Sequence, residues 1–171
     1  MYISDLLPIL SEPNLIAIVV RAILAFLASG LIGYDRNTHG APAGMRTHML
    51  VCLGSMIAMS TGQYAGLVFG SADITRIGAQ VVSGIGFLGA GSIIVTRQNK
   101  IQGLTTAAGL WASACIGLAL GVGFYEGAIM GTIAVYFTER VLRNWSKDVK
   151  ARSMSRYNQL DNADDDSLIQ N

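Results

Sequence analysis

Charge is scarce in this chain, and its scarcity excludes most classes of soluble protein. Only 13% of the 171 residues are charged, whereas an average soluble domain has about 25%. A disordered chain would also have far fewer apolar residues than the 51% found here. The net charge of +1 argues against a nucleic-acid-binding protein, which needs a basic patch. A polytopic membrane protein is the class that remains.

Cysteine is scarce as well, since the chain has only two, and no disulfide framework holds its fold. Cys52 and Cys115 are expected on different membrane spans at depths that differ by roughly 12 Å, too far apart for a disulfide. We interpret both as small packing residues. The two histidines are nine positions apart, which is no zinc spacing, and no residues resemble a catalytic triad. The sequence predicts no enzyme, no metal site and no cofactor.

Long apolar stretches are abundant. Five are present, each near the roughly 20 residues that a helix needs to cross a bilayer. They occupy residues 15–32, about 49–69, 77–95, 104–122 and about 124–142. The first is interpreted as a permanent helix, because the N-terminus lacks the Lys and Arg of a signal peptide. The sequence therefore predicts an all-α polytopic membrane protein, a compact bundle of about five transmembrane helices within residues 1–143.

Residues 144–171 are predicted to form a cytoplasmic tail, basic in its first half and acidic at its end. We expect this tail to be partly disordered. Two interpretations stay open. The basic half lies on an anionic membrane surface, or the whole tail is simply solvated.

Lysine and arginine are distributed unevenly between the two sides of the predicted bundle. Ten of the twelve follow the first, third and fifth apolar stretches. Of the other two, Arg76 lies between the second and third stretches, and Arg21 lies within the first. Positive charge concentrates on the cytoplasmic side of membrane proteins. We therefore expect the N-terminus outside and the C-terminus in the cytoplasm.

The predicted fourth helix has a small residue at every fourth position. These residues are Thr105, Gly109, Ser113, Gly117 and Gly121. In lipid, helices associate through close approach of their backbones, so small residues mark contact faces. We expect another helix to lie tightly along this stripe.

The predicted third helix is small on two faces. Gly84 and Gly91 share one face, and Gly86 and Gly89 lie nearly opposite. We therefore expect this helix at the centre of the bundle, although its glycines also permit a kinked or broken helix that lines a cavity. Residues 84–89 match G-x-G-x-x-G, but no strand precedes them and no acid follows at the required distance, so nucleotide binding is rejected.

Three segments resemble the motifs of the MgtC/SapB family, in family order. They are residues 33–36 (Gly-Tyr-Asp-Arg) with 43–48 (Ala-Gly-Met-Arg-Thr-His), residues 76–91, which contain Gly-Ile-Gly-Phe-Leu-Gly, and residues 103–111 (Gly-Leu-Thr-Thr-Ala-Ala-Gly-Leu-Trp). The similarity covers about residues 15–140. Asp35 stands where the family usually has Glu, and Met45 where it has Leu, and both changes are mild.

This resemblance implies a bacterial inner-membrane protein with about five helices. Family members are linked to growth in low magnesium and to survival inside host cells. They are described as regulators of other membrane machines, including the ATP synthase and magnesium-transporting P-type ATPases. Longer members add a C-terminal domain with an ACT-like fold, so we expect this chain to group with the short members that lack it.

Arg21 is the first candidate functional residue. A charged side chain inside a span is costly and is usually functional or paired. The residues that follow it on the same face, Ala25, Ser29 and Gly33, are small, which favours the bundle interior. Asp73 or Glu126 could then pair with it, and the alternative is that Arg21 snorkels to the outer headgroups.

A second group of candidates lies in the predicted loop between the first two spans. It contains Asp35, Arg36, Arg46, Thr47 and His48. These residues form either an ion-sensing or partner-docking surface, or a loop whose charges fix topology. Asp35 could pair with Arg46. A magnesium site takes one or two carboxylates and several waters, and this loop offers one acid, so a high-affinity site is not expected.

Arg76, Gln80, Thr105 and Thr106 are the remaining candidates. They could line a polar path from both ends into the glycine-rich centre. The alternative is interfacial anchoring with interhelical hydrogen bonds worth about 0.6 kcal/mol each.

Two functions compete for this chain. A regulator of other membrane proteins needs exposed helix faces and could self-associate. A small-ion or solute transporter subunit needs polar residues that face a cavity, and the absence of a carboxylate from the middle of any apolar stretch weakens a cation path. The expected partners are the lipid bilayer and other membrane proteins, with no nucleic acid.

Overall fold

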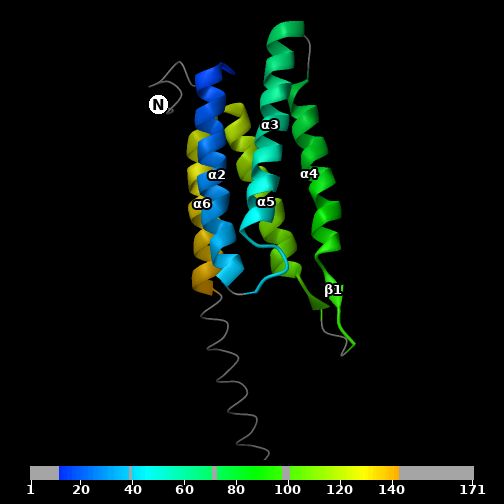
Figure 1. Cartoon of the computed structure of the whole chain (residues 1–171). Coiled ribbons are helices and arrows are strands. Elements are labelled where there is room, and N and C mark those ends of the chain that lie inside the picture. Colours follow the sequence, from blue (N-terminus) through cyan, green and yellow to red (C-terminus); the bar gives the residue numbers. More distant parts are fainter. Residues whose placement is uncertain (1–11, 39, 71–72, 98–100, 143–171) are drawn as a thin grey trace, which may run out of the picture. The chain divides into compact units, whose positions relative to one another are not determined.

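A computed structural model describes residues 12–38, 40–70, 73–97 and 101–142. Its α-helices are α2 (Leu15–Thr38), α3 (Met45–Phe69), α4 (Ile74–Gly91), α5 (Leu104–Val122) and α6 (Tyr125–Phe137) (Figure 1). Two short strands, β1 (Ile94–Val95) and β2 (Ile101–Gln102), separate α4 from α5. The all-α fold predicted from the apolar stretches is confirmed. The predicted tail, residues 144–171, lies outside the described residues.

The chain divides into two compact units, and the boundary follows Tyr136. The first unit contains the helices from α2 to almost the end of α6. In the second unit the described part is a π-helix, Thr138–Leu142. The predicted fifth span, residues 124–142, is therefore two elements of different geometry.

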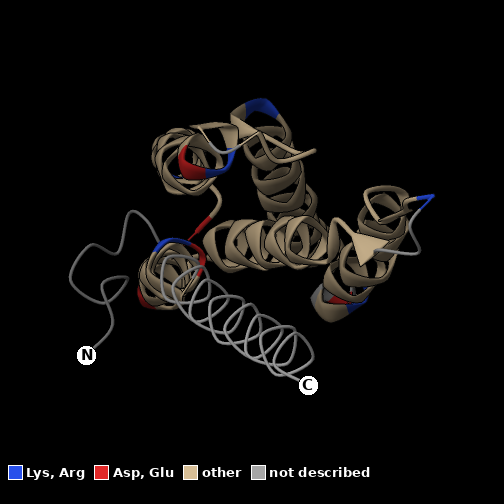
Figure 2. Cartoon of the chain, turned by 90° about the horizontal axis from the view of Figure 1, so that it is seen from below, with Lys and Arg blue, Asp and Glu red and all other residues tan. Residues whose placement is uncertain are grey.

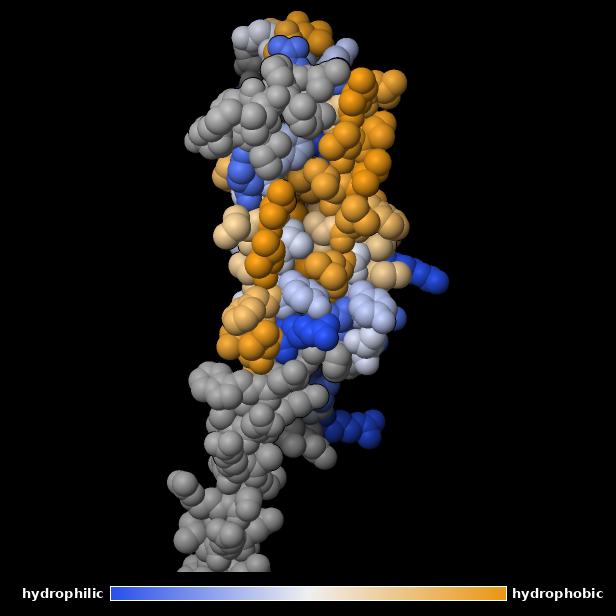
Figure 3. All heavy atoms as spheres, turned by 90° about the vertical axis from the view of Figure 1, so that its left-hand side faces the viewer, coloured by the Kyte–Doolittle hydropathy of each residue, from blue (hydrophilic) through white to orange (hydrophobic). Residues whose placement is uncertain are grey.

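Within the described residues, three helices are long and apolar enough to cross a membrane, namely α2, α3 and α5. Large apolar side chains such as Ile23, Phe26 and Leu27 are exposed on α2, and the surface seen from that side is largely apolar (Figure 3). Charged residues are few on the helices (Figure 2). An apolar exterior suits contact with lipid. The orientation of the termini stays a prediction.

The end of α2 corrects the first predicted boundary. The apolar stretch ends at residue 32, but the helix continues to Thr38, so Asp35 and Arg36 lie on a helix and not in a loop. Hydropathy falls where side chains become polar, while the backbone can remain helical until a breaker. Here the chain leaves the helix before Gly40, which has a φ of 64°, a conformation that favours glycine.

The connection between α4 and α5 corrects the third predicted span, which was expected to run through residue 95. The helix ends at Gly91, and Ile94 and Val95 pair antiparallel with Gln102 and Ile101. β-branched residues favour a strand once a helix has ended. Gly103 has a φ of 93°, and a Cβ there would collide with the Ser92 carbonyl oxygen. Only glycine fits where α5 begins against the end of α4.

Helices α3 and α5 form the centre of the bundle. Helix α2 packs on both of them, and α4 also packs on both, at the edge farthest from α2 (Figure 1). A Cβ added at Gly84, Gly86 or Gly91 would meet no atom within 4 Å, whereas one at Gly89 would lie 3.5 Å from Ala107 of α5. The prediction of a central third helix is therefore wrong. Helix α4 is continuous, and one of its two small faces is left without a neighbour in the described chain.

The small-residue stripe on α5 lies against α3, as expected. A Cβ at Gly117 would overlap the Cys52 carbonyl oxygen, and one at Gly121 would lie 2.6 Å from that of Met56. Gly109 and Ser113 are buried in the same interface, whereas Thr105 is exposed. Close backbone approach is thus the structural role of these positions on α5.

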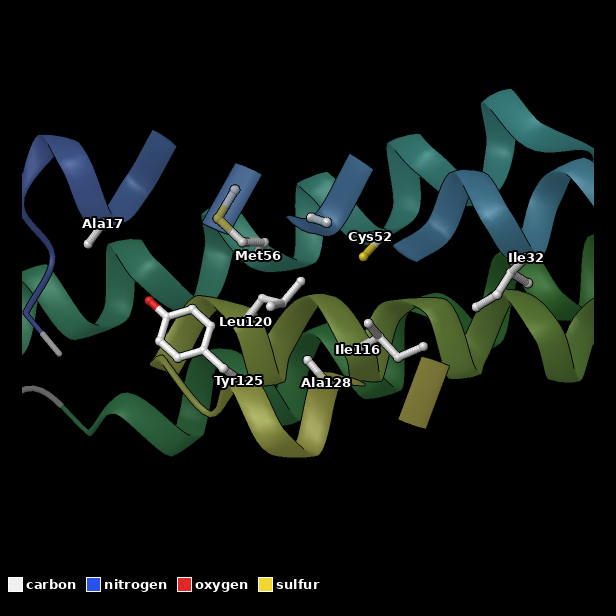
Figure 4. Packing of buried hydrophobic residues seen from close by; sticks show 9 residues of the cluster. Ala17, Ile32, Cys52, Met56, Ile116, Leu120, Tyr125 and Ala128 are labelled. Carbon is white, nitrogen blue, oxygen red and sulfur yellow. The ribbon is translucent and has the colours of Figure 1, made fainter. Parts of the chain in front are cut away.

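Apolar side chains complete the interior along α2, α3, α5 and α6 (Figure 4). The buried cluster consists of Ala17, Ala25, Ile32, Cys52, Met56, Ile116, Leu120, Tyr125 and Ala128. Cys52 is fully buried and Cys115 is half-buried, and both are free thiols. Their interpretation as packing residues agrees with these positions.

Candidate functional site

Buried polar side chains follow the interface of α2, α3 and α5 from one end of the bundle to the other. We call them the polar seam: Arg21, Ser29, Arg36, His48, Ser55, Ser60, Thr106 and Ser113, each no more than 9% exposed. Buried polar groups are costly unless they are hydrogen-bonded. The seam therefore has to be described through its bonds.

Arg21 lies at one end of the seam and is fully buried. Its Nη1 donates to Gln63 Oε1 at 2.8 Å and to the Gly121 carbonyl oxygen at 2.7 Å, and its Nε donates to Tyr125 Oη at 3.3 Å. The Ser60 hydroxyl donates to the same Gly121 oxygen at 3.0 Å. The interior placement of Arg21 agrees with the expectation from its small neighbours on α2, and snorkelling does not occur.

The Gly121 oxygen explains why a cation fits here. The last four carbonyls of a helix lack partners within it, and Gly121 is the last residue but one of α5. The C-terminus of a helix also has a partial negative charge that a cation stabilises. Arg21 thus caps the end of α5 from a neighbouring helix.

Two acidic residues, Asp73 and Glu126, were predicted as possible ion-pair partners of Arg21, and the structure decides only the first. Asp73 is exposed at the start of α4, where it accepts hydrogen bonds from Thr75 and lies 4.0 Å from Arg76 Nε. The hydrogen bond from the Thr75 hydroxyl holds the pKa of Asp73 below its usual value. Pairing of Arg21 with Asp73 is therefore wrong. Pairing with Glu126, in the first turn of α6, stays a prediction.

Arg36 lies at the other end of the seam, where its Nη2 donates to Thr106 Oγ1 at 2.7 Å. Thr106 is in the first turn of α5. The two arginines are fifteen residues apart on α2, a separation of roughly 22 Å along a helix. Side chains from one helix therefore hold both ends of α5.

His48 lies between these ends and joins α3 to α5. Its Nδ1 is 2.8 Å from the Ser113 hydroxyl, and its buried Nε2 has no hydrogen-bond partner among the described residues. A Cβ at Gly33 would lie 2.5 Å from Met45 Cα, so glycine lets the first turn of α3 approach α2.

The other loop candidates lie on the surface. Arg46 and Thr47 are exposed in the first turn of α3, while Asp35 is buried on α2. No ion pair joins Arg46 to Asp35 in the part of the chain that the structure describes. The predicted pairing across the hairpin is therefore wrong, because Asp35 is buried on α2 whereas Arg46 is exposed at the start of α3.

Arg76, Gln80 and Thr105 do not form the predicted polar path. All three are exposed, and only Thr106 of the two neighbouring threonines enters the interface. Gln80 shares a face of α4 with other small or exposed residues. We call this the outer face of α4: Arg76, Gln80, Ser83 and Gly84. It points away from α3 and α5.

Sequence analysis does not single out Gln63, which accepts from Arg21, or the seam residue Ser113 for chemistry. Gln63 has a visible signal, since it is an amide within an apolar stretch. The sequence pattern marks Ser113 only as a small packing residue. Its role as the partner of His48 depends on a contact between residues 65 positions apart.

The hydrogen bond between Arg36 and Thr106 can be tested with a matched control at Thr105, the neighbouring threonine. Thr106→Val keeps the shape of the side chain but removes the acceptor, and we expect it to lower the free energy of unfolding by about 2 kcal/mol. Thr105→Val makes the same change on the surface and is expected to stay within about 0.5 kcal/mol. Unfolding of the purified protein in detergent, followed by circular dichroism, measures both. Equal effects would show that the bond adds no stability.

Comparison with known proteins identifies the family to which the chain is similar. The model of the MgtC family matches residues 22–147. The chain is 46% identical over 120 residues to an Escherichia coli K12 protein named putative magnesium transporter YhiD, covering 67% of this chain and 55% of that protein. It is 40% identical over 132 residues to Protein MgtC of Brucella abortus, covering 77% and 54%.

A Haemophilus influenzae protein is 33% identical over 168 residues, covering 93% of this chain and 71% of that protein. The chain spans about half the length of YhiD and of the Brucella protein. No solved structure matches it. The family match includes most of the polar seam and the whole of α3, α4 and α5, so the chain belongs to the MgtC family.

Proposed function

We propose that this protein is a multi-pass protein of the bacterial inner membrane that regulates other membrane proteins in magnesium homeostasis and adaptation to low magnesium. Its membership of the MgtC family and the name of its YhiD relative support the link to magnesium. The proposed partners are membrane machines such as the ATP synthase or a P-type ATPase. We further propose that the protein is no enzyme, that it lies with its N-terminus outside, and that the virulence link of its family extends to it.

The outer face of α4 is the observation that supports a regulatory role best. Gln80, Ser83 and Gly84 lie one helical turn apart on it and are exposed. A glutamine amide without a hydrogen-bond partner is costly in hydrocarbon, and small residues mark places where helices approach. A neighbouring helix from another protein would satisfy the amide and fill the space above Gly84.

The polar seam supports a transporter less well. Arg21, Arg36, His48 and Ser60 bond to groups on other helices and so join the helices together. Ser29 and Ser55 donate to carbonyl oxygens of their own helices. Asp35 is the only acidic residue within α2, α3 or α5, whereas a cation path needs acidic or carbonyl ligands at membrane depth. If the protein is a transporter, the two buried arginines, Arg21 and Arg36, favour an anion as the transported ion.

Photocrosslinking in native membranes tests the regulatory proposal. A photoreactive residue at Ser83, on the outer face of α4, is expected to capture a subunit of the ATP synthase or of a P-type ATPase in cells grown at low magnesium. The same residue at Ile23, an exposed position on α2, should capture lipid. Gly84→Leu should reduce the Ser83 adduct, because the new side chain occupies the space for the partner. Equal protein adducts at both positions, or none at Ser83, would contradict the proposal.

A flux measurement addresses the alternative directly. Purified protein in liposomes is tested for magnesium and anion flux, with Arg21→Ala as the matched variant. The regulatory proposal expects no flux from either protein. Flux in the wild type that disappears in Arg21→Ala would support the transporter instead.

A further inference from the structure

A second surface feature lies at the opposite end of α4 from Asp73. It is a groove of about 370 Å³ between the start of α3, the end of α4 with β1, and α5. Ligand pockets usually have a volume of roughly 300–1,000 Å³. The end of α4 and β1, which contribute to the lining of the groove, lie at the lower end of α4 in Figure 1. Its size and position mark it as a candidate binding site.

The lining of the groove is mainly apolar. Leu88 and Gly91 line it from α4, Ile94 from β1 and Leu110 from α5. Leu88 and Ile94 are exposed, so both have surface that a ligand could cover. A Cβ at Gly91 would meet no atom within 4 Å, so the floor of the groove is open there. An apolar chain fits this lining.

A polar residue lines one side of the groove, and two exposed arginines lie close to lining residues in the sequence. Thr47 lines it from the first turn of α3 and is exposed, and the preceding residue is the exposed Arg46. Arg97, also exposed, follows the lining residue Ile94 by three positions. No acidic residue lies between His48 and Gly70, or between Ile74 and Ile101. The charged residues that α3, α4 and β1 place next to this groove are therefore arginines.

The start of α3 places the rim of the groove, Arg46 and Thr47, near a membrane surface. Both residues begin α3, which is a candidate span, so they belong at the level where headgroups meet hydrocarbon. Leu88 is one turn before the end of α4, and Ile94 lies in β1 beyond that end, so the apolar lining extends from this level along α4. Arginine side chains at this level attract anionic lipid headgroups.

We propose that this groove binds one anionic phospholipid, with an acyl chain along Leu88, Ile94 and Leu110 and the phosphate beside Arg46 and Thr47. The site goes beyond the proposed regulatory function and does not depend on it. A zwitterionic lipid has the same acyl chains, but its headgroup lacks the net negative charge that complements the rim. Selectivity for headgroup charge is therefore the property that separates this site from general contact with lipid.

Lipid binding to the delipidated full chain in neutral detergent tests the site. Native mass spectrometry is used with phosphatidylglycerol and, as the matched probe, phosphatidylcholine of the same chains. We expect one tightly bound phosphatidylglycerol. A cation near a membrane surface is worth about fivefold in affinity for an anionic lipid, so Arg46→Gln should reduce phosphatidylglycerol binding about fivefold. Arg76→Gln, exposed at the other end of α4, should have no effect.

A second pair of variants tests the groove itself. Gly91→Leu fills the open floor and is expected to abolish the bound lipid, whereas Gly84→Leu, about two turns earlier on the same face of α4 and not part of the lining, should leave it bound. Inorganic phosphate at millimolar concentration should not compete. Equal binding of the two lipids, unchanged binding in Gly91→Leu, or full competition by phosphate would overturn the proposal. So would a change of oligomeric state in Gly91→Leu, because the groove would then hold a second copy.

Discussion

Arg21→Met is expected to destabilise the protein strongly. The substitution keeps an apolar stem of similar length but removes the two short hydrogen bonds to Gln63 and the Gly121 carbonyl. Bonds from a charged donor are worth about 1.5 kcal/mol each, so we expect a loss of about 3 kcal/mol in the free energy of unfolding. Arg21→Lys retains the charge beside the C-terminus of α5 and should recover about half of it. Thermal unfolding in detergent, followed by circular dichroism, provides the measurement.

Arg76→Met is the matched control, because Arg76 is exposed and is expected to change stability by no more than about 0.5 kcal/mol. A buried ion can also be replaced by an apolar side chain without loss of stability. If Arg21→Met proves as stable as the wild type, Arg21 does not hold α5 in place. The liposome experiment would then decide whether it serves a path for anions.

The helices were predictable because each depends on local sequence. Long apolar stretches predicted α2, α3 and α5, and small neighbours on one face predicted that Arg21 is interior. The ends of helices were less predictable. Asp35 and Arg36 are polar but remain helical, and Ile94 and Val95 are apolar but form a strand. Hydropathy reports on the surroundings of side chains and only indirectly on backbone geometry.

The position of α4 was not predictable from its glycines. A small residue shows that a close neighbour is tolerated, but it does not show whether that neighbour belongs to the same chain. Gly89 meets Ala107 of α5, while Gly84 meets nothing in the described chain. The outer face is therefore where the sequence pattern and the fold of one chain disagree, which is a further reason to look for a partner there.

The contacts within the polar seam could not be predicted from the sequence either. Arg36 and Thr106 are 70 residues apart, and the sequence offered both neighbouring threonines as candidates. Only the rotation of α5 about its axis decides that Thr106 faces Arg36 and Thr105 faces outward. That rotation is set by the packing of Gly117 and Gly121 against α3.

Gly117→Ala is expected to have the second large effect, because the backbone of α3 lies directly against this residue of α5. The added methyl would overlap the Cys52 carbonyl oxygen and lie 2.9 Å from Ser55 Cβ. Neither atom is the end of a flexible side chain, so the two helices have to separate. Such overpacking costs about 1–3 kcal/mol, and we expect a loss near the upper end. Thermal unfolding and the rate of crosslinking between cysteines introduced on α3 and α5 report the loss of contact.

Gly54→Ala makes the same chemical change on α3 at an exposed position where the new methyl meets no atom within 4 Å. Alanine favours a helix over glycine by up to about 1 kcal/mol, so Gly54→Ala should be neutral or slightly stabilising. The two substitutions are thus expected to differ in sign, which a general effect of glycine flexibility cannot produce. If Gly117→Ala were also neutral, α3 and α5 could separate at little cost. The hydrogen bonds of seam residues such as Arg21 and His48 would then contribute more to holding the bundle together than the close contact of α3 with α5.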